Sequence, residues 1–161
     1  MYFRFPVYLN LHHNNCVVIG GGRYATAAVE LLLQFGASVT VISPRLSDAL
    51  KALDAEHRIR YIPRRHFRGD CANAYLAVAA TDSNSVNIAV AEECKARRIL
   101  VNVASPAEYG TFSLPQVAVC EDVLVAVHEE PGAKNRESRV AQRIEALLPS
   151  LLEEEAADTE A

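Results

Sequence analysis

The chain has 161 residues, of which 50% are apolar and 22% are charged, and its formal net charge is −4. This length allows one domain with a small appendage, and this composition allows a buried core, which excludes both two full domains and intrinsic disorder. The acidic balance argues against nucleic acid as a main partner, because phosphate binding needs basic side chains. Apolar runs are far shorter than the roughly 18 residues of a membrane span. No signal-like arrangement follows Met1, and the four scattered cysteines suit reduced thiols, so we expect a cytoplasmic protein with no membrane partner.

Strand-like apolar runs alternate with helical stretches over residues 16–102, which is typical of βαβ units that build a parallel sheet with helices on both faces. Residues 16–19 are wholly apolar, as in a central strand that is buried on both sides. Three glycines end this run, and over residues 23–35 apolar side chains recur at helical spacing until Gly36. The other predicted elements are strands at 38–42, 58–62, 75–79 and 100–103, a helix that Ser47 caps, and a helix at 83–97.

The pattern changes after residue 102. Residues 112–120 and 123–128 are two strand-like segments joined by Glu121-Asp122, which predicts a hairpin. A helix is expected over residues 136–148, with Pro149 near its end, and the acidic residues 153–161 are expected to be a disordered tail. A hairpin and one helix are too small to bury their apolar faces alone, so this segment predicts a homodimer.

A glycine-rich turn joins the first predicted strand to the first predicted helix. Its sequence, Gly20-Gly21-Gly22-Arg23-Tyr24-Ala25, fits the GxGxxA pattern in the strand-to-helix setting that this pattern requires. Gly20 allows the tight turn, Gly22 lets the backbone approach a diphosphate, and Ala25 keeps the helix close to the strand. Amide groups and the positive end of the helix then face the phosphates. We therefore expect an α/β, Rossmann-like fold that binds NAD through residues 20–25, with a turn that binds nothing as the alternative.

Candidate residues for the rest of the cofactor follow the second and fourth strands. Dinucleotide folds place an acidic residue for the adenosine ribose at the end of the second strand, where this sequence has Ser43. A serine can hydrogen-bond a ribose hydroxyl without repelling a 2′-phosphate. Arg45, just beyond Pro44, attracts a 2′-phosphate, so the sequence does not exclude NADP as the cofactor in place of NAD. Thr81 and Asp82 end the fourth strand, where they are expected to line the ligand crevice. The alternative for Asp82 is an N-cap or a first-turn carboxylate of the next helix.

Five blocks of sequence share their order and spacing with one known family. They are Phe5-Pro6-Val7-Tyr8-Leu9-Asn10-Leu11, Val17 to Gly22, Val39 to Pro44, Ala79-Ala80-Thr81-Asp82 with Asn87, and Val101-Asn102-Val103. On these residues the chain resembles the precorrin-2 dehydrogenase and sirohydrochlorin ferrochelatase family of siroheme synthesis, over about residues 3–128. The resemblance implies a Rossmann domain with a dimerisation segment, and NAD-dependent oxidation of the tetrapyrrole precorrin-2 to sirohydrochlorin. It also implies that the tetrapyrrole meets the nicotinamide near residues 102–105.

These expectations divide the chain into three parts. Residues 1–111 form the dinucleotide-binding domain, residues 112–152 form the dimerisation segment, and residues 153–161 form the tail. Because the implied substrate carries several carboxylates, its docking surface is expected to be basic. The basic stretch Arg58, Arg60, Arg64, Arg65, His66 and Arg68 is one candidate, and Lys134, Arg136 and Arg139 are a weaker one; an ordinary solvated surface is the alternative.

Two departures from the family pattern bear on catalysis. The family carries an aspartate just after the Val-Asn-Val block, and here Ser105 stands at that position. A serine is neither a carboxylate base nor a good iron ligand, which weighs against ferrochelatase activity, and Glu108 is a displaced carboxylate or an exposed loop residue. After the hairpin, His128 stands where the family has a small-residue turn, and it is a candidate acid or base. The candidate catalytic residues are Ser105, Asp82, Glu108 and His128, and no metal site is expected.

The serine at position 105, the pair Glu129-Glu130 after the hairpin and the absence of the family's helical C-terminal domain favour a second hypothesis, in which the chain is a dinucleotide-binding module that has lost catalysis. Such a module acts as a redox sensor, a tetrapyrrole carrier or a partner subunit. The regulatory domains of membrane transporters also have a Rossmann core, but the blocks at residues 5–11 and 101–103 point away from them. Turnover of precorrin-2 with NAD separates the enzyme from the module.

Overall fold

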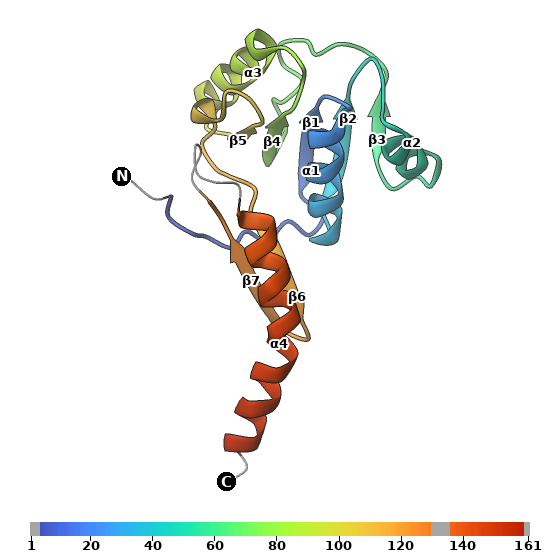
Figure 1. The fold of residues 1–161 in the computed structure, drawn as a ribbon. Coiled ribbons are helices and arrows are strands. Elements are labelled where there is room, and N and C mark those ends of the chain that lie inside the picture. Colours follow the sequence, from blue (N-terminus) through green and yellow to red (C-terminus); the bar gives the residue numbers. More distant parts are fainter. Residues whose placement is uncertain (1–3, 130–135, 160–161) are drawn as a thin grey trace. The chain divides into compact units, whose positions relative to one another are not determined.

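The computed structural model describes residues 4–129 and 136–159, and the chain divides between Ser113 and Leu114 into two compact units (Figure 1). The first unit is built on a five-stranded parallel sheet with the order β3-β2-β1-β4-β5. Its strands are β1 (Asn15–Ile19), β2 (Ser38–Ile42), β3 (Arg60–Ile62), β4 (Leu76–Ala79) and β5 (Leu100–Val103). Its helices are α1 (Arg23–Gln34), α2 (Asp48–Ala55) and α3 (Asn84–Ala96), and the short η1 (Ala107–Tyr109) follows β5.

Both faces of this sheet are covered. Val17 and Ile19 of β1 pack with Val90 of α3 in one buried cluster. Cys16 and Val18 point to the opposite face, because side chains alternate along a strand, and they are fully buried as well. Right-handed connections place α1 and α2 on that opposite face, since the order runs outward from β1 to β3 on one side and from β4 to β5 on the other. The predicted Rossmann-like sheet with helices on both faces is confirmed.

Local signals set the ends of the helices. Gly36 follows α1 in the left-handed conformation, with φ of 74°, and its N–H donates to the Leu33 carbonyl oxygen, which is how a glycine ends a helix. Ser47 caps α2 as predicted. The cap of α3 is Ser83, whose hydroxyl oxygen accepts the Val86 N–H, and not Asp82. The alternative role of Asp82, as a cap or first-turn carboxylate of this helix, is therefore wrong, and the exposed residue precedes the helix.

The second unit is an antiparallel hairpin packed against one long helix. The strands are β6 (Gln116–Cys120) and β7 (Val123–Val127), and the helix is α4 (Glu137–Thr159). The turn lies at Glu121-Asp122, as predicted, with Glu121 at φ of 53°. Ala118 of β6 is fully buried, and Ala141 and Leu148 of α4 are buried too. The predicted hairpin and helix are confirmed, although the first strand begins at residue 116 and not at 112.

The helix of the second unit is longer than predicted. We expected it to end at residue 148 and residues 153–161 to form a disordered tail, but α4 continues through Pro149 to Thr159. A proline removes one backbone hydrogen bond and bends a helix, whereas the leucine, glutamate and alanine residues that follow favour continued helix. The predicted helix end was therefore wrong, and so was the tail over residues 153–159. Residues 160–161 lie outside the described chain.

Candidate functional site

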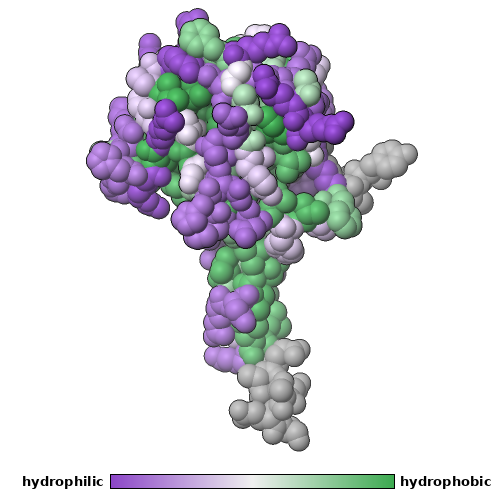
Figure 2. All heavy atoms as spheres, turned by 180° about the vertical axis from the view of Figure 1, so that it is seen from behind, coloured by the Kyte–Doolittle hydropathy of each residue, from purple (hydrophilic) through white to green (hydrophobic). Residues whose placement is uncertain are grey.

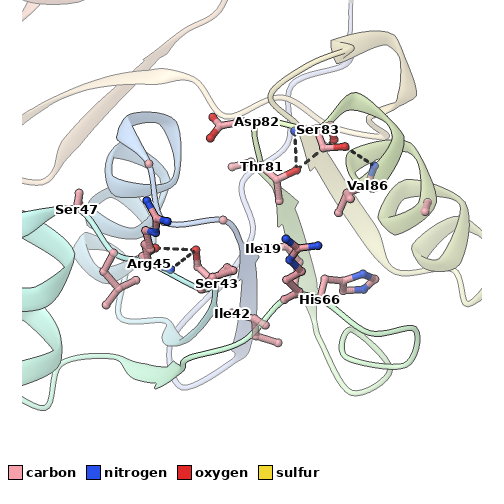
Figure 3. Close-up of a pocket in the computed structure, with 18 of the residues that line it drawn as sticks. Ile19, Ile42, Ser43, Arg45, Ser47, His66, Thr81, Asp82, Ser83 and Val86 are labelled. Carbon is pink, nitrogen blue, oxygen red and sulfur yellow. Dashed lines mark hydrogen bonds between the residues drawn. The ribbon is translucent and has the colours of Figure 1, made fainter.

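A cavity of about 950 Å³ opens at the carboxyl ends of β1, β2 and β4 (Figure 3). Its walls are the glycine turn at residues 20–22, the segment 43–47 after β2, Arg65 and His66 after β3, and residues 80–83 with the first turns of α3. Figure 3 shows Ser43 and Arg45 on one side of the cavity and the segment 81–83 on the other. Open α/β sheets bind their ligands in this crevice, at the point where the strand order reverses.

The three glycines of the turn are needed for different reasons. Gly20 has a φ of 124°, and a Cβ there would collide with the Ala80 carbonyl group. A Cβ at Gly21 would collide with the Arg45 carbonyl oxygen. At Gly22, by contrast, the Cβ position meets nothing within 4 Å in the described chain apart from the residues next to it in sequence. The first two glycines therefore let the turn pack against its neighbours, while the third leaves the backbone open towards a ligand.

The amino end of α1 is suited to an anion. Gly22 is its N-cap, no side chain caps the helix, and its first turn has no acidic residue. The first amides of a helix have no carbonyl partner within it, and the helix dipole places partial positive charge there. The Ser47 N–H donates to the Gly21 carbonyl oxygen at 2.8 Å and holds the turn in place. This glycine cradle, residues 20–22 with the first turn of α1, fits the diphosphate of a dinucleotide.

Most of the residues predicted for cofactor binding line the cavity. Those that do are Gly20, Gly21, Gly22, Ser43, Pro44, Arg45, Thr81 and Asp82. Arg23, Tyr24, Ala25 and Asn102 lie outside the cavity lining. Ala25 is fully buried, as expected of a residue that keeps α1 close to the sheet. The Tyr24 hydroxyl donates to Asn102 Oδ1 at 2.8 Å, so this pair ties the start of α1 to β5.

Ser43 reaches the cavity, but its hydroxyl is already engaged. The side chain is 6% exposed, and Oγ donates to the Arg45 carbonyl oxygen at 2.7 Å. The Arg45 N–H in turn donates a longer hydrogen bond, of 3.4 Å, to Ser43 Oγ. Since the hydroxyl proton is used within this turn, Ser43 can only accept a further hydrogen bond. The exposed residues that follow it, Pro44 and Arg45, are better placed to meet a ribose.

Asn87 joins the ends of β4 and β5. The residue is fully buried on α3, and its Oδ1 accepts the Thr81 N–H at 3.0 Å and the Thr81 hydroxyl at 2.7 Å. Its Nδ2 donates to the Thr81 carbonyl oxygen at 3.0 Å and to the Ser105 carbonyl oxygen at 2.9 Å. Every polar atom of the amide is therefore paired. The sequence blocks contain Asn87, and the structure shows that it holds the two strand ends together.

The four candidate catalytic residues are spread over the chain. Asp82 is exposed and lines the cavity. Ser105 and Glu108 are exposed after β5, the second of them in η1, and neither lines the cavity. His128 belongs to the second unit, where its Nδ1 lies 4.0 Å from Glu137 Oε1. Burial raises the pKa of Glu137 above its ordinary value.

Sequence reasoning missed part of the cavity wall. It did not assign Ser47, Arg65, His66, Ser83, Ser85 and Val86 to the cofactor site. Arg65 and His66 were noted only as members of a basic stretch. The missing signal is the strand order, because β3 pairs with β2 and the chain beyond β3 is thereby brought to the cavity. Within the described residues, no three His, Cys, Asp or Glu side chains gather to hold a metal ion, and none of the helices there is long and apolar enough for a membrane span.

The comparisons with known proteins cover most of the chain. A family model described as putative NAD(P)-binding matches residues 7–116. The siroheme synthase of Methylobacillus flagellatus is 39% identical over 145 residues, which cover 90% of this chain and 31% of that protein. The siroheme synthase of Chromobacterium violaceum is 36% identical over 146 residues, which cover 91% of this chain and 31% of that protein. The chain thus spans less than a third of the length of these relatives.

A solved structure gives a likeness that extends beyond the sheet. The structure of "SirC, precorrin-2 dehydrogenase" superposes with a TM-score of 0.72 at 25% sequence identity, and the match covers 89% of this chain and 70% of that one. The match to the family model includes the glycine turn and every residue that lines the cavity. The chain therefore belongs to the putative NAD(P)-binding family.

Proposed function

We propose that this chain is an NAD-dependent dehydrogenase that oxidises precorrin-2 to sirohydrochlorin. The reaction removes one hydride and one proton from precorrin-2, and the products are sirohydrochlorin, NADH and a proton. The observation that carries the proposal is the glycine cradle, where Gly22 leaves the end of α1 open at a cavity of about 950 Å³. The likeness to the SirC structure and to siroheme synthases supports the choice of substrate.

The residues of the first unit bind and orient the cofactor. The amides of the glycine cradle hold the diphosphate, and Arg45 meets the adenosine ribose beyond the occupied hydroxyl of Ser43. Thr81 and Asp82 border the half of the cavity next to β4. When bound, NAD supplies the carbon that accepts the hydride. The protein contributes mainly by holding the reacting groups in a productive orientation.

We assign Asp82 as the carboxylate that accepts the proton released from precorrin-2. Among the described residues that line the cavity, it is the only acidic one. Its neighbour Thr81 and the family's aspartate position, Ser105, are both hydrogen-bonded to Asn87. A carboxylate at the end of β4 therefore lies beside the segment where the family has one after β5. Asp82 takes the place of that aspartate as a proton acceptor.

We also propose that the second unit assembles a homodimer. Ala118 and its strand partner Val125 face α4, so Val117, Val119 and Leu124 lie on the opposite face of the hairpin. That face is apolar, Val119 is 42% exposed, and Figure 2 shows apolar side chains gathered on this unit. A two-stranded sheet with one open apolar face is marginally stable by itself. A second copy presents the same face, and a twofold axis lets the two faces cover each other.

The test is turnover. Purified protein is mixed under anaerobic conditions with precorrin-2 and NAD, and sirohydrochlorin and NADH are followed by absorbance in parallel with an NADP reaction. We expect equal amounts of both products, and much less of either from the Gly22→Asp variant at an NAD concentration that just saturates the unmodified chain. The four cysteines are free thiols, which fits a reducing compartment and supports our placement of this reaction in the cytoplasm.

One observation favours a second candidate function. Ser105 is exposed and stands where the family carries an aspartate, which is the pattern of a dinucleotide-binding module without catalysis. Such a module binds NAD and a tetrapyrrole but forms no sirohydrochlorin. Tight NAD binding without turnover would overturn the proposal of a dehydrogenase and support that of a non-catalytic binding module. We expect no iron insertion after addition of Fe²⁺, since serine is a poor ligand for iron.

A further inference from the structure

A clamped loop, residues 64–70, follows β3 and has a fixed shape. The Arg64 guanidinium donates to both carboxylate oxygens of Asp70, at 2.7 and 2.8 Å, and to the Arg65 carbonyl oxygen at 3.0 Å. The Phe67 N–H donates to Asp70 at 2.8 Å. The hydrogen bonds from Arg64 lower the pKa of Asp70, which shows that they favour the ionised carboxylate. A two-pronged bond of this kind holds the ends of the loop together.

The clamped loop is also attached to α3. The carboxylate of Glu93 is 5% exposed, and its Oε1 accepts the Gly69 N–H at 2.8 Å. Its Oε2 lies 3.8 Å from Nε2 of His66, whose side chain is 10% exposed. Glu93 thus contacts the loop at two places. The hydrogen bond to Gly69 ties the loop to α3, the helix that forms another wall of the cavity, whereas the His66–Glu93 distance is too long for a hydrogen bond.

Arg65 differs from the two basic residues beside it. Arg64 is paired with Asp70, and His66 lies against Glu93. No carboxylate of the described chain lies within ion-pair distance of Arg65, which is exposed and lines the cavity. The loop therefore presents a guanidinium to the cavity on a rigid backbone.

The strand order indicates which half of a dinucleotide this guanidinium would meet. Dinucleotide folds hold the adenosine ribose at the end of the second strand. Here β3 pairs in parallel with β2, with Ile62 beside Ile42, and Arg65 follows Ile62 by only three residues. Arg65 thus approaches from the adenosine side. Ile42 and Val86 line the same cavity and offer the apolar contact that a flat base requires.

We infer that Arg65 binds the adenosine half of the cofactor, with its planar guanidinium stacked on the adenine ring. Arginine stacks on flat π systems, and lysine lacks the planar group that this contact needs. Arg64, Asp70 and Glu93 act as positioning residues, because their hydrogen bonds set the backbone that carries Arg65. This inference rests on the proposed function, since it requires a dinucleotide in the cavity.

The test compares ligands that carry one or the other half of the cofactor, and Arg65→Lys separates the loss of charge from the loss of the planar group. Isothermal titration calorimetry measures binding of NAD, AMP and nicotinamide mononucleotide to the unmodified chain and to Arg65→Ala, Arg65→Lys and Arg68→Ala. We expect both Arg65 variants to bind NAD and AMP about 10-fold more weakly, and nicotinamide mononucleotide unchanged. Arg68 is exposed on the same loop outside the cavity lining, so its variant serves as the matched control and keeps full affinity.

Three results would overturn the assignment of Arg65 and leave the proposed function untouched. They are unchanged AMP affinity in Arg65→Ala, full rescue by Arg65→Lys, and an equal loss for nicotinamide mononucleotide, which would place the contact at a phosphate or at the other half of the cofactor. Thermal unfolding of the unliganded variants checks that the fold is kept. An unmodified chain that binds no NAD at all would instead refute the proposed function.

Discussion

The two units of this chain bury their sheets in different ways. In the first unit, helices cover both faces of the parallel sheet, and the accessible chemistry lies at the strand ends. In the second unit, α4 covers one face of a hairpin and Val119 remains 42% exposed on the other. A sheet that is closed on both faces has only its ends left for a ligand, whereas a sheet closed on one face needs a partner. Cofactor binding and assembly are therefore expected to respond to different substitutions.

The largest effect is expected on the stability of the first unit. Asn87→Leu removes four hydrogen bonds and leaves the amide of Thr81 and the carbonyl oxygen of Ser105 without this partner. We expect the free energy of unfolding to fall by about 4 kcal/mol, measured by urea denaturation. Asn84→Leu makes the same change at an exposed position of the same helix, and its effect is expected to stay below about 0.5 kcal/mol. Equal losses in both variants would show that Asn87 does not join the strand ends.

Gly22→Asp is expected to separate binding from assembly. Its Cβ meets open space, so the fold is kept, but the new carboxylate lies where the diphosphate binds. We expect NAD affinity to fall by about 100-fold, equivalent to about 2.7 kcal/mol, by calorimetry. Gly20→Ala is the contrasting variant, because it collides with Ala80 and lowers the melting temperature. Unchanged NAD affinity in Gly22→Asp would show that the phosphate site is elsewhere.

Val119→Glu is expected to weaken the dimer and to leave NAD binding unchanged. A carboxylate on the open face of the hairpin opposes its burial between two copies, so the dissociation constant of the dimer is expected to rise by about 30-fold. Sedimentation equilibrium measures this constant, and NAD affinity per chain stays the same. Gln142→Glu adds the same charge at an exposed position of α4 and leaves the dimer intact. A Val119→Glu protein that still dimerises fully would move the interface away from this face.

The smallest effect concerns acid. Because the pKa of Asp70 is lowered in the folded chain, its bonds with Arg64 add stability above the ordinary carboxyl pKa of about 3.9, and this contribution is lost as the pH falls below that value. Asp70→Asn is expected to cost about 1 kcal/mol at neutral pH and progressively less in acid. In the second unit, burial raises the pKa of Glu137, so the pH dependence is opposite. Protonation of Glu137 in acid is expected to remove the cost of burying its charge and so to stabilise this unit. A cost of Asp70→Asn that does not change between neutral pH and pH 3 would contradict the assignment, and denaturation at both pH values measures it.

Parts of the site follow from local sequence and others do not. The turn at Gly20, the helix end at Gly36 and the cap at Ser47 were predicted because each is a property of a few adjacent residues. The role of Arg65 was not predicted, since it depends on the pairing of β3 with β2. The length of α4 was misjudged because Pro149 was read as a helix end, while the sequence beyond it favours helix.

The amino-acid order alone specified an alternating α/β domain, a phosphate-binding turn and a hairpin with a helix, because glycine conformations, apolar spacing and caps act over short stretches of chain. Only the tertiary structure showed that the hydroxyl of Ser43 is occupied, that Asn87 joins two strand ends, and that a loop clamped by Arg64 and Asp70 forms a wall of the cavity. These features depend on contacts between residues far apart in the chain or on the exact path of the backbone, which hydrophobic periodicity does not encode.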